Sequence, residues 1–161
     1  MILILDVDGT LANIDHRLLL IDKIKPTAKD WNAFFDPKLV ALDTPIRGTR
    51  YLFPKLLMEF DKLIFLTGRP ERLRKVTHTW LEEIYSFYFD PRDLLMRPEH
   101  WAATDDISVR AKFKSAIFQQ EILPQYPKQN FIFIDDNVSI LKELAEFGIT
   151  IKAPECWKLF Y

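Results

Sequence analysis

The sequence predicts an α/β protein in which helices cover both faces of a parallel sheet. Short apolar segments alternate along the chain with segments of helical periodicity, the order that successive βα units produce. The apolar segments have no alternating polar face, which is typical of strands buried on both sides. Three of them end at acidic or hydroxyl residues. In an open parallel sheet these ends share one edge, where ligands bind.

Five apolar runs define the predicted strands. Those at Ile2–Leu5, Leu63–Leu66 and Phe131–Ile134 are continuous and bounded by polar residues, whereas those at Asp93–Met96 and Ile149–Lys152 are weaker. Their length of four residues suits a buried strand better than a helix.

Four helices are predicted from apolar residues that recur three or four positions apart. Pro70 suits the first position of the second helix, and Gly148 suits the stop of the fourth. The expected spans are Leu52–Phe60, Leu73–Ile84, Val109–Ile122 and Ile140–Phe147.

Composition and charge limit the class of protein. With 161 residues, 48% of them hydrophobic and 14% aromatic, residues 1–161 are expected to form a single folded domain rather than a disordered chain. The 22 basic and 23 acidic residues leave a net charge of −1, which argues against an extended nucleic-acid surface but permits a small phosphorylated molecule or a strand end. The single Cys156 allows no internal disulfide, and the run Met1–Leu5 is too short for a signal peptide or membrane span, so a cytoplasmic location is expected.

One long segment interrupts the alternation. Residues 11–44 contain two prolines, mixed charge and an aromatic cluster from Trp31 to Phe35, without a strong strand signal. We interpret this segment as a small cap or lid-like insertion after the first strand, with two short helices. Trp31 could line a substrate entrance together with His16 and Arg17, but Trp31 and Phe35 are expected to form the cap's own core rather than stack on bases.

Two acidic residues follow the first strand directly. Asp6 and Asp8 are two positions apart, so their carboxylates project the same way from an extended chain, and Gly9 then allows a sharp turn. Taken alone, this pattern also suits a solvated corner. Buried together, two such carboxylates need a cation or a proton.

The other two strong strands end in complementary groups. Thr67 and Gly68 offer a hydroxyl and a backbone N–H for an anion, and Asp135 and Asp136 offer two further carboxylates. Each feature has a structural alternative, because such residues also cap helices. Together at one edge, they indicate a site for Mg²⁺ and a phosphoryl group.

A lysine on the third helix completes this predicted site. Lys114 precedes Ile117 and Phe118 by three and four residues, on the apolar stripe, whereas Lys112 lies on the polar face. We therefore favour Lys114, although a lysine whose stem extends along the core edge would give the same pattern.

These motifs resemble those of the haloacid dehalogenase superfamily, in their usual order, across almost the whole chain. The resemblance implies a Rossmann-like core with strand order 5-4-1-2-3, an Asp6 nucleophile and an Asp8 acid/base. It also implies Mg²⁺ held by Asp6, the Asp8 carbonyl and Asp135, with Asp136 assisting. Thr67 and Lys114 would then bind the phosphoryl oxygens.

A narrower resemblance rests on five further segments, Leu66–Arg69, Thr77–Leu81, Leu95–Pro98, Asp105–Asp106 and Glu155–Trp157. These segments are similar to the 3′-phosphatase domain of phage polynucleotide kinase and its phage and bacterial relatives. The interval between Asp106 and Lys114 is longer than in that domain, and this chain has no P-loop kinase module. A phage origin is hinted at only by this likeness.

The expected activity is Mg²⁺-dependent hydrolysis of a phosphomonoester, on a nucleotide or a nucleic-acid 3′ end. Gly68, Arg69 and Arg97 are the candidate substrate-binding residues, the two arginines for a neighbouring phosphate. A small metabolite or free mononucleotide is the alternative substrate. A third interpretation is a non-catalytic Mg²⁺- and phosphate-binding module, such as a receiver domain. A receiver domain, however, carries its acidic pair near the N-terminus, whereas the acidic pair of this chain comes late. The sequence does not indicate the oligomeric state.

Overall fold

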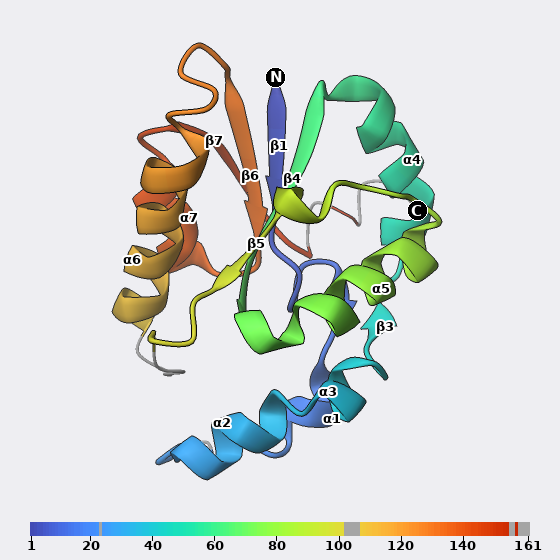
Figure 1. Cartoon of the computed structure of the whole chain (residues 1–161), viewed down its shortest axis with the longest axis vertical. Coiled ribbons are helices and arrows are strands. Elements are labelled where there is room, and N and C mark those ends of the chain that lie inside the picture. The colour runs from blue at the N-terminus through green and yellow to red at the C-terminus, as the bar shows by residue number, and fades with distance from the viewer. Residues whose placement is uncertain (23, 102–106, 155–156, 158–161) are drawn as a thin grey trace.

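A central parallel sheet with helices on both faces dominates the structure, a computed structural model (Figure 1). The expectations that rest on Asp105, Asp106, Glu155 and Cys156 lie outside the described residues. The residues described are 1–22, 24–101, 107–154 and 157.

Five strands form the sheet, in the order β5-β4-β1-β6-β7, and each neighbouring pair is parallel. Counted within this sheet alone and read from the other edge, the order is the expected 5-4-1-2-3. The chain numbering differs in detail because β2 and β3 form a separate two-stranded ribbon. The sheet strands are β1 (Ile2–Leu5), β4 (Lys62–Pro70), β5 (Leu94–Arg97), β6 (Phe131–Asp135) and β7 (Gly148–Lys152).

The side chains of β1 alternate between two apolar layers. Leu3 and Leu5 belong to one buried cluster, and Ile2 and Ile4 belong to the other. A strand buried on both faces needs no polar side, which explains the uninterrupted apolar run. The prediction of a doubly covered sheet is confirmed.

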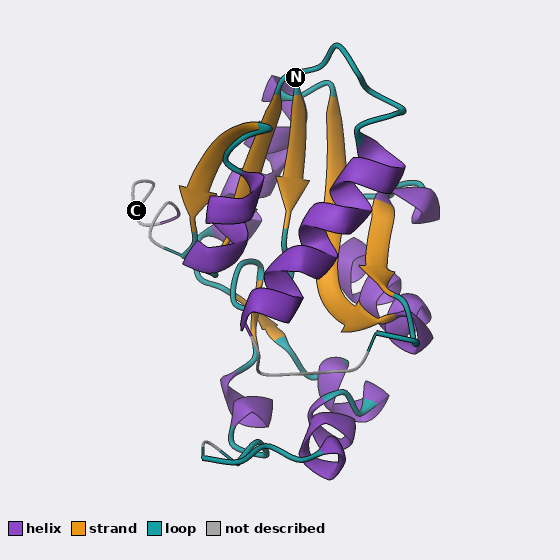
Figure 2. Cartoon of the chain, turned by 90° about the vertical axis from the view of Figure 1, so that its left-hand side faces the viewer, coloured by secondary structure: helices purple, strands orange, loops and turns teal. Residues whose placement is uncertain are grey.

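Helices cover each face of the sheet, as Figures 1 and 2 show. Beside the first apolar cluster lie α4 and α5, and beside the second lie α6 and α7. A π-helical turn continues α6, and short 3₁₀ turns flank α5. The bounds are α4 (Thr49–Glu59), η1 (Glu71–Leu73), α5 (Arg74–Tyr85), η2 (Pro91–Asp93), α6 (Ile107–Ile117), η3 (Phe118–Ile122) and α7 (Val138–Leu144).

Residues 11–44, called here the cap segment, lie beyond the carboxyl ends of the strands (Figure 2). The described residues of this segment form three short helices rather than the two expected. The Asp36 side chain accepts a hydrogen bond from the Lys38 N–H and starts an additional turn at Pro37. The ribbon of β2 and β3 closes the base of the segment. The elements are β2 (Ala12–Asn13), α1 (Asp15–Leu18), α2 (Ala28–Phe34), α3 (Pro37–Val40) and β3 (Thr44–Pro45).

Two local expectations are wrong. Strand β4 continues to Pro70, which pairs with Arg97 after a register shift, so Pro70 ends a strand rather than opening a helix. Gly148 does not stop α7, which ends four residues earlier, but begins β7. A Cβ there would lie 2.3 Å from the Phe131 carbonyl oxygen, so the close strand approach explains this glycine.

None of the described helices is both long and apolar enough to cross a membrane.

Candidate active site

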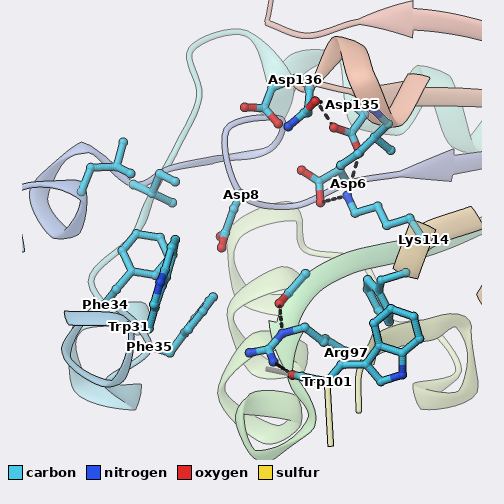
Figure 3. Close-up of a pocket in the computed structure, with 16 residues that line it drawn as sticks. Asp6, Asp8, Trp31, Phe34, Phe35, Arg97, Trp101, Lys114, Asp135 and Asp136 are labelled. Carbon is cyan, nitrogen blue, oxygen red and sulfur yellow. Dashed lines mark hydrogen bonds and ion pairs between the residues drawn. The ribbon is translucent and has the colours of Figure 1, made fainter. Parts of the chain in front are cut away.

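Neighbouring strands end side by side beneath the cap segment. Leu5 of β1 pairs with Phe65 of β4 and Ile134 of β6. The residues that follow Leu5 and Ile134 therefore reach the same edge of the sheet. A pocket of about 240 Å³ opens there, lined by the acids of β1 and β6 on one side and by the cap segment on the other (Figure 3).

Lys114 joins the acids of two strands. Its Nζ donates to Asp6 Oδ1 and to Asp135 Oδ2, each at 2.6 Å, and all three side chains are buried. The other oxygen of Asp6 accepts from the Thr10 hydroxyl at 3.3 Å. The structure thus brings Lys114 to the acids, whereas Lys112 is exposed.

Asp136 joins Asp6 and Asp135 in an acidic group. One carboxylate oxygen from each of the three lies within 4.8 Å of the others. Gly9 approaches this group closely, because a Cβ at Gly9 would lie 2.5 Å from Asp136 Oδ2, and the φ of +79° also favours glycine. The turn after β1 can therefore pass beside Asp136 only without a side chain.

The electrostatics of this acidic group favour a cation. Burial raises the pKa of Asp6 well above its usual range, and Asp135 and Asp136 add to the rise against the opposing charge of Lys114. Desolvation and the neighbouring Asp135 carboxylate raise the pKa of Asp136 to about 6. One ammonium therefore leaves negative charge uncompensated. Three clustered carboxylates are oxygen donors of the kind that a hard divalent ion prefers, so the donor set fits Mg²⁺.

Asp8 is held by two buried arginines. Its Oδ1 accepts from Arg17 Nη2 at 2.6 Å, and from Arg69 Nε at 2.8 Å and Nη2 at 2.6 Å. Asp43 sits behind both guanidinium groups and accepts from Arg17 at 2.8 Å and from Arg69 at 2.6 Å. We call Asp8, Arg17, Asp43 and Arg69 the buried quartet. It joins the turn after β1, strand β4 and both ends of the cap segment.

The quartet fixes the charge of Asp8. Burial would raise the pKa of Asp8, but Arg69 and Arg17 outweigh it and hold that pKa below its usual value. Asp8 is therefore a carboxylate at neutral pH in the free protein. In the metal-free structure Asp6 thus favours its protonated form and Asp8 its carboxylate form, the reverse of the states in which a nucleophile and a general acid begin. A cation bound by the acidic group would lower the pKa of Asp6 and favour its carboxylate.

The comparisons with known proteins agree with this geometry. Residues 1–153 match the family described as the polynucleotide kinase PNKP phosphatase domain. The chain belongs to this family. As a phosphatase domain of the haloacid dehalogenase type, it is a hydrolase. A comparison with curated proteins gives no match.

Two solved structures share the fold of this phosphatase domain. The Pnkp1/Rnl/Hen1 complex contains a chain 20% identical in sequence, with a TM-score of 0.59 over 94% of this chain and 45% of that one. A haloacid dehalogenase-like family hydrolase from Streptococcus pneumoniae is 13% identical, with a TM-score of 0.55 over 94% of this chain and 83% of that one. The phosphatase domain thus spans less than half the length of the first of these chains.

Thr67 and Gly68 lie inside β4 rather than at a helix start. Thr67 is fully buried, and its hydroxyl accepts from the Arg69 N–H at 3.3 Å. Gly68 lines the pocket, and its carbonyl accepts from Arg97 Nε at 3.0 Å. Thr67 is not among the residues that line the pocket, so its contact with a phosphoryl group stays a prediction.

The two candidate arginines occupy different positions in the phosphatase domain. Arg97 lines the pocket and also donates to the Trp101 carbonyl. Arg69 does not line it, and its guanidinium donates to Asp8, Asp43 and Thr77. In this arrangement Arg97 faces the pocket and Arg69 holds Asp8.

Sequence reasoning missed the role of Asp43 and misplaced Arg17. Arg17 was expected at a substrate entrance, but it is fully buried in the quartet. Asp43 lies 26 residues after Arg17, and no spacing rule relates the two ends of an irregular insertion. The sequence offers one signal for this pair: an Arg and an Asp lie near the two ends of an insertion that leaves and rejoins the same domain, so the two ends lie close together.

Proposed function

We propose that this phosphatase domain is a Mg²⁺-dependent phosphomonoesterase that acts through an aspartyl-phosphate on Asp6. The observation that carries the proposal is the placement of Asp6 and Asp8 in one pocket. Asp6 belongs to the acidic group and pairs with Lys114, whereas Asp8 pairs with Arg17 and Arg69. Mg²⁺ held by Asp6, the Asp8 carbonyl, Asp135 and Asp136 would neutralise the phosphoryl charge. We also propose that residues 1–161 act as one domain with residues 11–44 as its cap.

In the first step, an Asp6 carboxylate oxygen attacks phosphorus and the bond to the ester oxygen breaks. Asp8, protonated in the bound complex, transfers its proton to that leaving oxygen, so an alcohol departs. Negative phosphate near Asp8 opposes the two guanidinium groups and favours this protonation. Lys114 compensates charge on the phosphoryl oxygens, and Thr67 is proposed to bind them too.

In the second step, a water molecule attacks the phosphorus of the aspartyl-phosphate and passes a proton to Asp8. The bond to Asp6 breaks and inorganic phosphate leaves. Asp8 then releases this proton to solvent, because it is a carboxylate in the free protein, and takes up another when the next substrate binds. Both steps need a second carboxylate beside the nucleophile, which explains why the two acids lie two positions apart directly after β1.

We propose that the substrate is a nucleotide or nucleic-acid 3′-phosphate. Family membership and the likeness to a chain of the Pnkp1/Rnl/Hen1 complex support this class. Gly68 and Arg97 lie at the pocket, where they would bind the substrate.

A substrate panel tests the proposal. A 3′-phosphorylated oligonucleotide, a nucleoside 3′-monophosphate, a sugar phosphate and 4-nitrophenyl phosphate are each incubated with Mg²⁺ and with chelator. We expect Mg²⁺-dependent release of phosphate, fastest from the nucleotide substrates. Asp6→Asn should abolish release, whereas Asp61→Asn, an exposed acid that contacts the N-terminus, should have no effect. Preference for the sugar phosphate would overturn the substrate class, and full activity in Asp6→Asn would overturn the nucleophile.

A further inference from the structure

The pocket changes character beyond Asp8. Its far wall comes from the cap segment, which contributes three aromatic and two aliphatic side chains to the lining (Figure 3). None of these five side chains carries a carboxylate, an amide, a hydroxyl or an ammonium group, and the single polar atom among them is the indole N–H of one tryptophan. The wall residues are Ile14, Leu18, Trp31, Phe34 and Phe35.

The three aromatic rings of this wall form one packed cluster. Trp31 stacks on Phe35 with ring centroids 6.1 Å apart and an interplanar angle of 23°, and its edge contact with Phe34 has a centroid distance of 5.7 Å. Phe34 and Phe35 are buried, whereas Trp31 is only partly buried. All three rings line the pocket, and Trp31 is the one with the most accessible surface. The two phenylalanines pack against its ring and hold it in place.

Arg97 and Trp101 line the pocket next to this wall. Arg97 lies with its guanidinium carbon 5.6 Å from the Phe35 ring centroid, fixed by its bonds to the Gly68 and Trp101 carbonyls. The Trp101 ring packs on Phe113 with centroids 5.5 Å apart. Planar groups therefore make up much of the pocket lining beyond the acids.

The position of the general acid Asp8 places the leaving group next to this wall. Asp8 lies between the acidic group and the aromatic cluster (Figure 3). Because Asp8 gives its proton to the leaving oxygen, that oxygen lies beside Asp8, and the rest of the leaving group extends toward the wall. The hydroxyls of a sugar would lose water there without gaining partners, which is costly. The apolar π-face of a nucleobase would not.

We infer that Trp31 is a specificity-determining residue on which the terminal nucleobase of a 3′-phosphorylated strand stacks. The inference rests on the proposed function and narrows it, since it assigns recognition to the base next to the phosphate. Phe35 remains part of the cap core, as the sequence predicts, but Trp31 has a surface in the pocket as well.

Two matched substrates test this inference. One is an oligonucleotide with a 3′-phosphate, and the other is the same strand with its terminal nucleotide lacking the base. Loss of one stacked base corresponds to about a 5- to 150-fold loss of affinity. We expect Trp31→Ala to raise KM for the base-bearing strand by about that factor, with kcat unchanged within about twofold, and to leave KM for the abasic strand unchanged. Trp31→Phe, which keeps a π-face, should restore most of the difference.

The comparison within one variant keeps the test valid even if Trp31→Ala loosens the cap. An equal loss for both strands would mean that Trp31 supports the fold only, and would overturn the inference. So would a wild-type protein that hydrolyses both strands with the same kcat/KM. In either case Mg²⁺-dependent turnover would leave the proposed function standing. Absence of turnover of both strands by the wild type would instead overturn the proposed function.

Discussion

Replacement of Asp43 by asparagine removes one charge from the buried quartet while keeping the shape of the side chain. Asp43 is 4% exposed, and its carboxylate accepts three hydrogen bonds from Arg17 and Arg69, whose side chains are fully buried. In Asp43→Asn, the Asp8 carboxylate is the one remaining negative charge of the quartet for two buried guanidinium groups. The new amide N–H₂ group also faces the N–H donors of Arg17 or Arg69, where it cannot accept a hydrogen bond.

The expected cost follows from burial. Removing one partner of a buried ion pair costs about 3–5 kcal/mol, because the remaining charge is left without compensation. For a chain of this length each kcal/mol lowers the Tm by about 2–4 °C. We therefore expect a fall in Tm of about 6–20 °C by calorimetry, with a matching loss in urea unfolding. Because Arg17 also anchors Asp8, kcat should fall as well.

Two further variants make the measurement decisive. Asp93→Asn breaks the partly exposed 2.7 Å pair with Lys62 and should cost less than about 1 kcal/mol. Arg17→Met combined with Asp43→Asn should cost less than the sum of the single changes, because the two residues are coupled. An Asp43→Asn cost as small as that of Asp93→Asn, or strict additivity with Arg17→Met, would refute this reasoning.

Three other outcomes are expected. Asp8→Asn should release one equivalent of nitrophenolate from 4-nitrophenyl phosphate in a rapid burst, because that leaving group needs no proton. The variant should then turn over about 10²–10⁴-fold slower than the wild type. Stopped-flow absorbance measures both phases, and an unchanged steady rate would remove the acid/base role. Gly9→Ala should weaken Mg²⁺ binding in calorimetry, because its Cβ would displace the Asp136 carboxylate; unchanged affinity would contradict the placement of Asp136 near the ion. Mg²⁺ affinity should also fall by up to about tenfold per pH unit below the Asp136 pKa of about 6, because the ion must displace a proton. Mg²⁺ binding that does not depend on pH would argue against a shifted carboxyl in the site. Since the pKa of Asp136 is raised, the metal-free fold gains stability from this group as pH falls from about 6 toward 4 and loses it as pH rises through 6.

The features that could be predicted from sequence are those that depend on short-range periodicity. Continuous apolar runs such as Ile2–Leu5 identify strands with two buried faces, and parallel topology then brings Asp6 and Asp135 to one edge. Helical spacing was enough to prefer Lys114 over Lys112, since only one face of α6 can turn toward the sheet.

The features that could not be predicted depend on irregular backbone. The continuation of β4 to Pro70 arises from a register shift that no apolar pattern encodes. The quartet depends on how the ends of the cap segment fold together, and Arg17 and Asp43 are related only through that fold. The pocket surface of Trp31 likewise depends on tertiary placement, because an aromatic residue on a short helix suits both a core and a binding surface.

The buried quartet has a consequence for how such domains can diversify. Arg17 and Asp43 attach the two ends of the cap segment to Asp8 and Arg69, while Trp31 lies on the stretch of chain between those ends. On the proposed role of Trp31, the residues that select a leaving group lie between these two anchors, and the residues that break the ester lie outside that stretch. Replacing the residues between the two anchors with those of another cap should exchange the preferred substrate and leave the bond-breaking apparatus unaltered, which makes this insertion a natural unit for engineering new specificities.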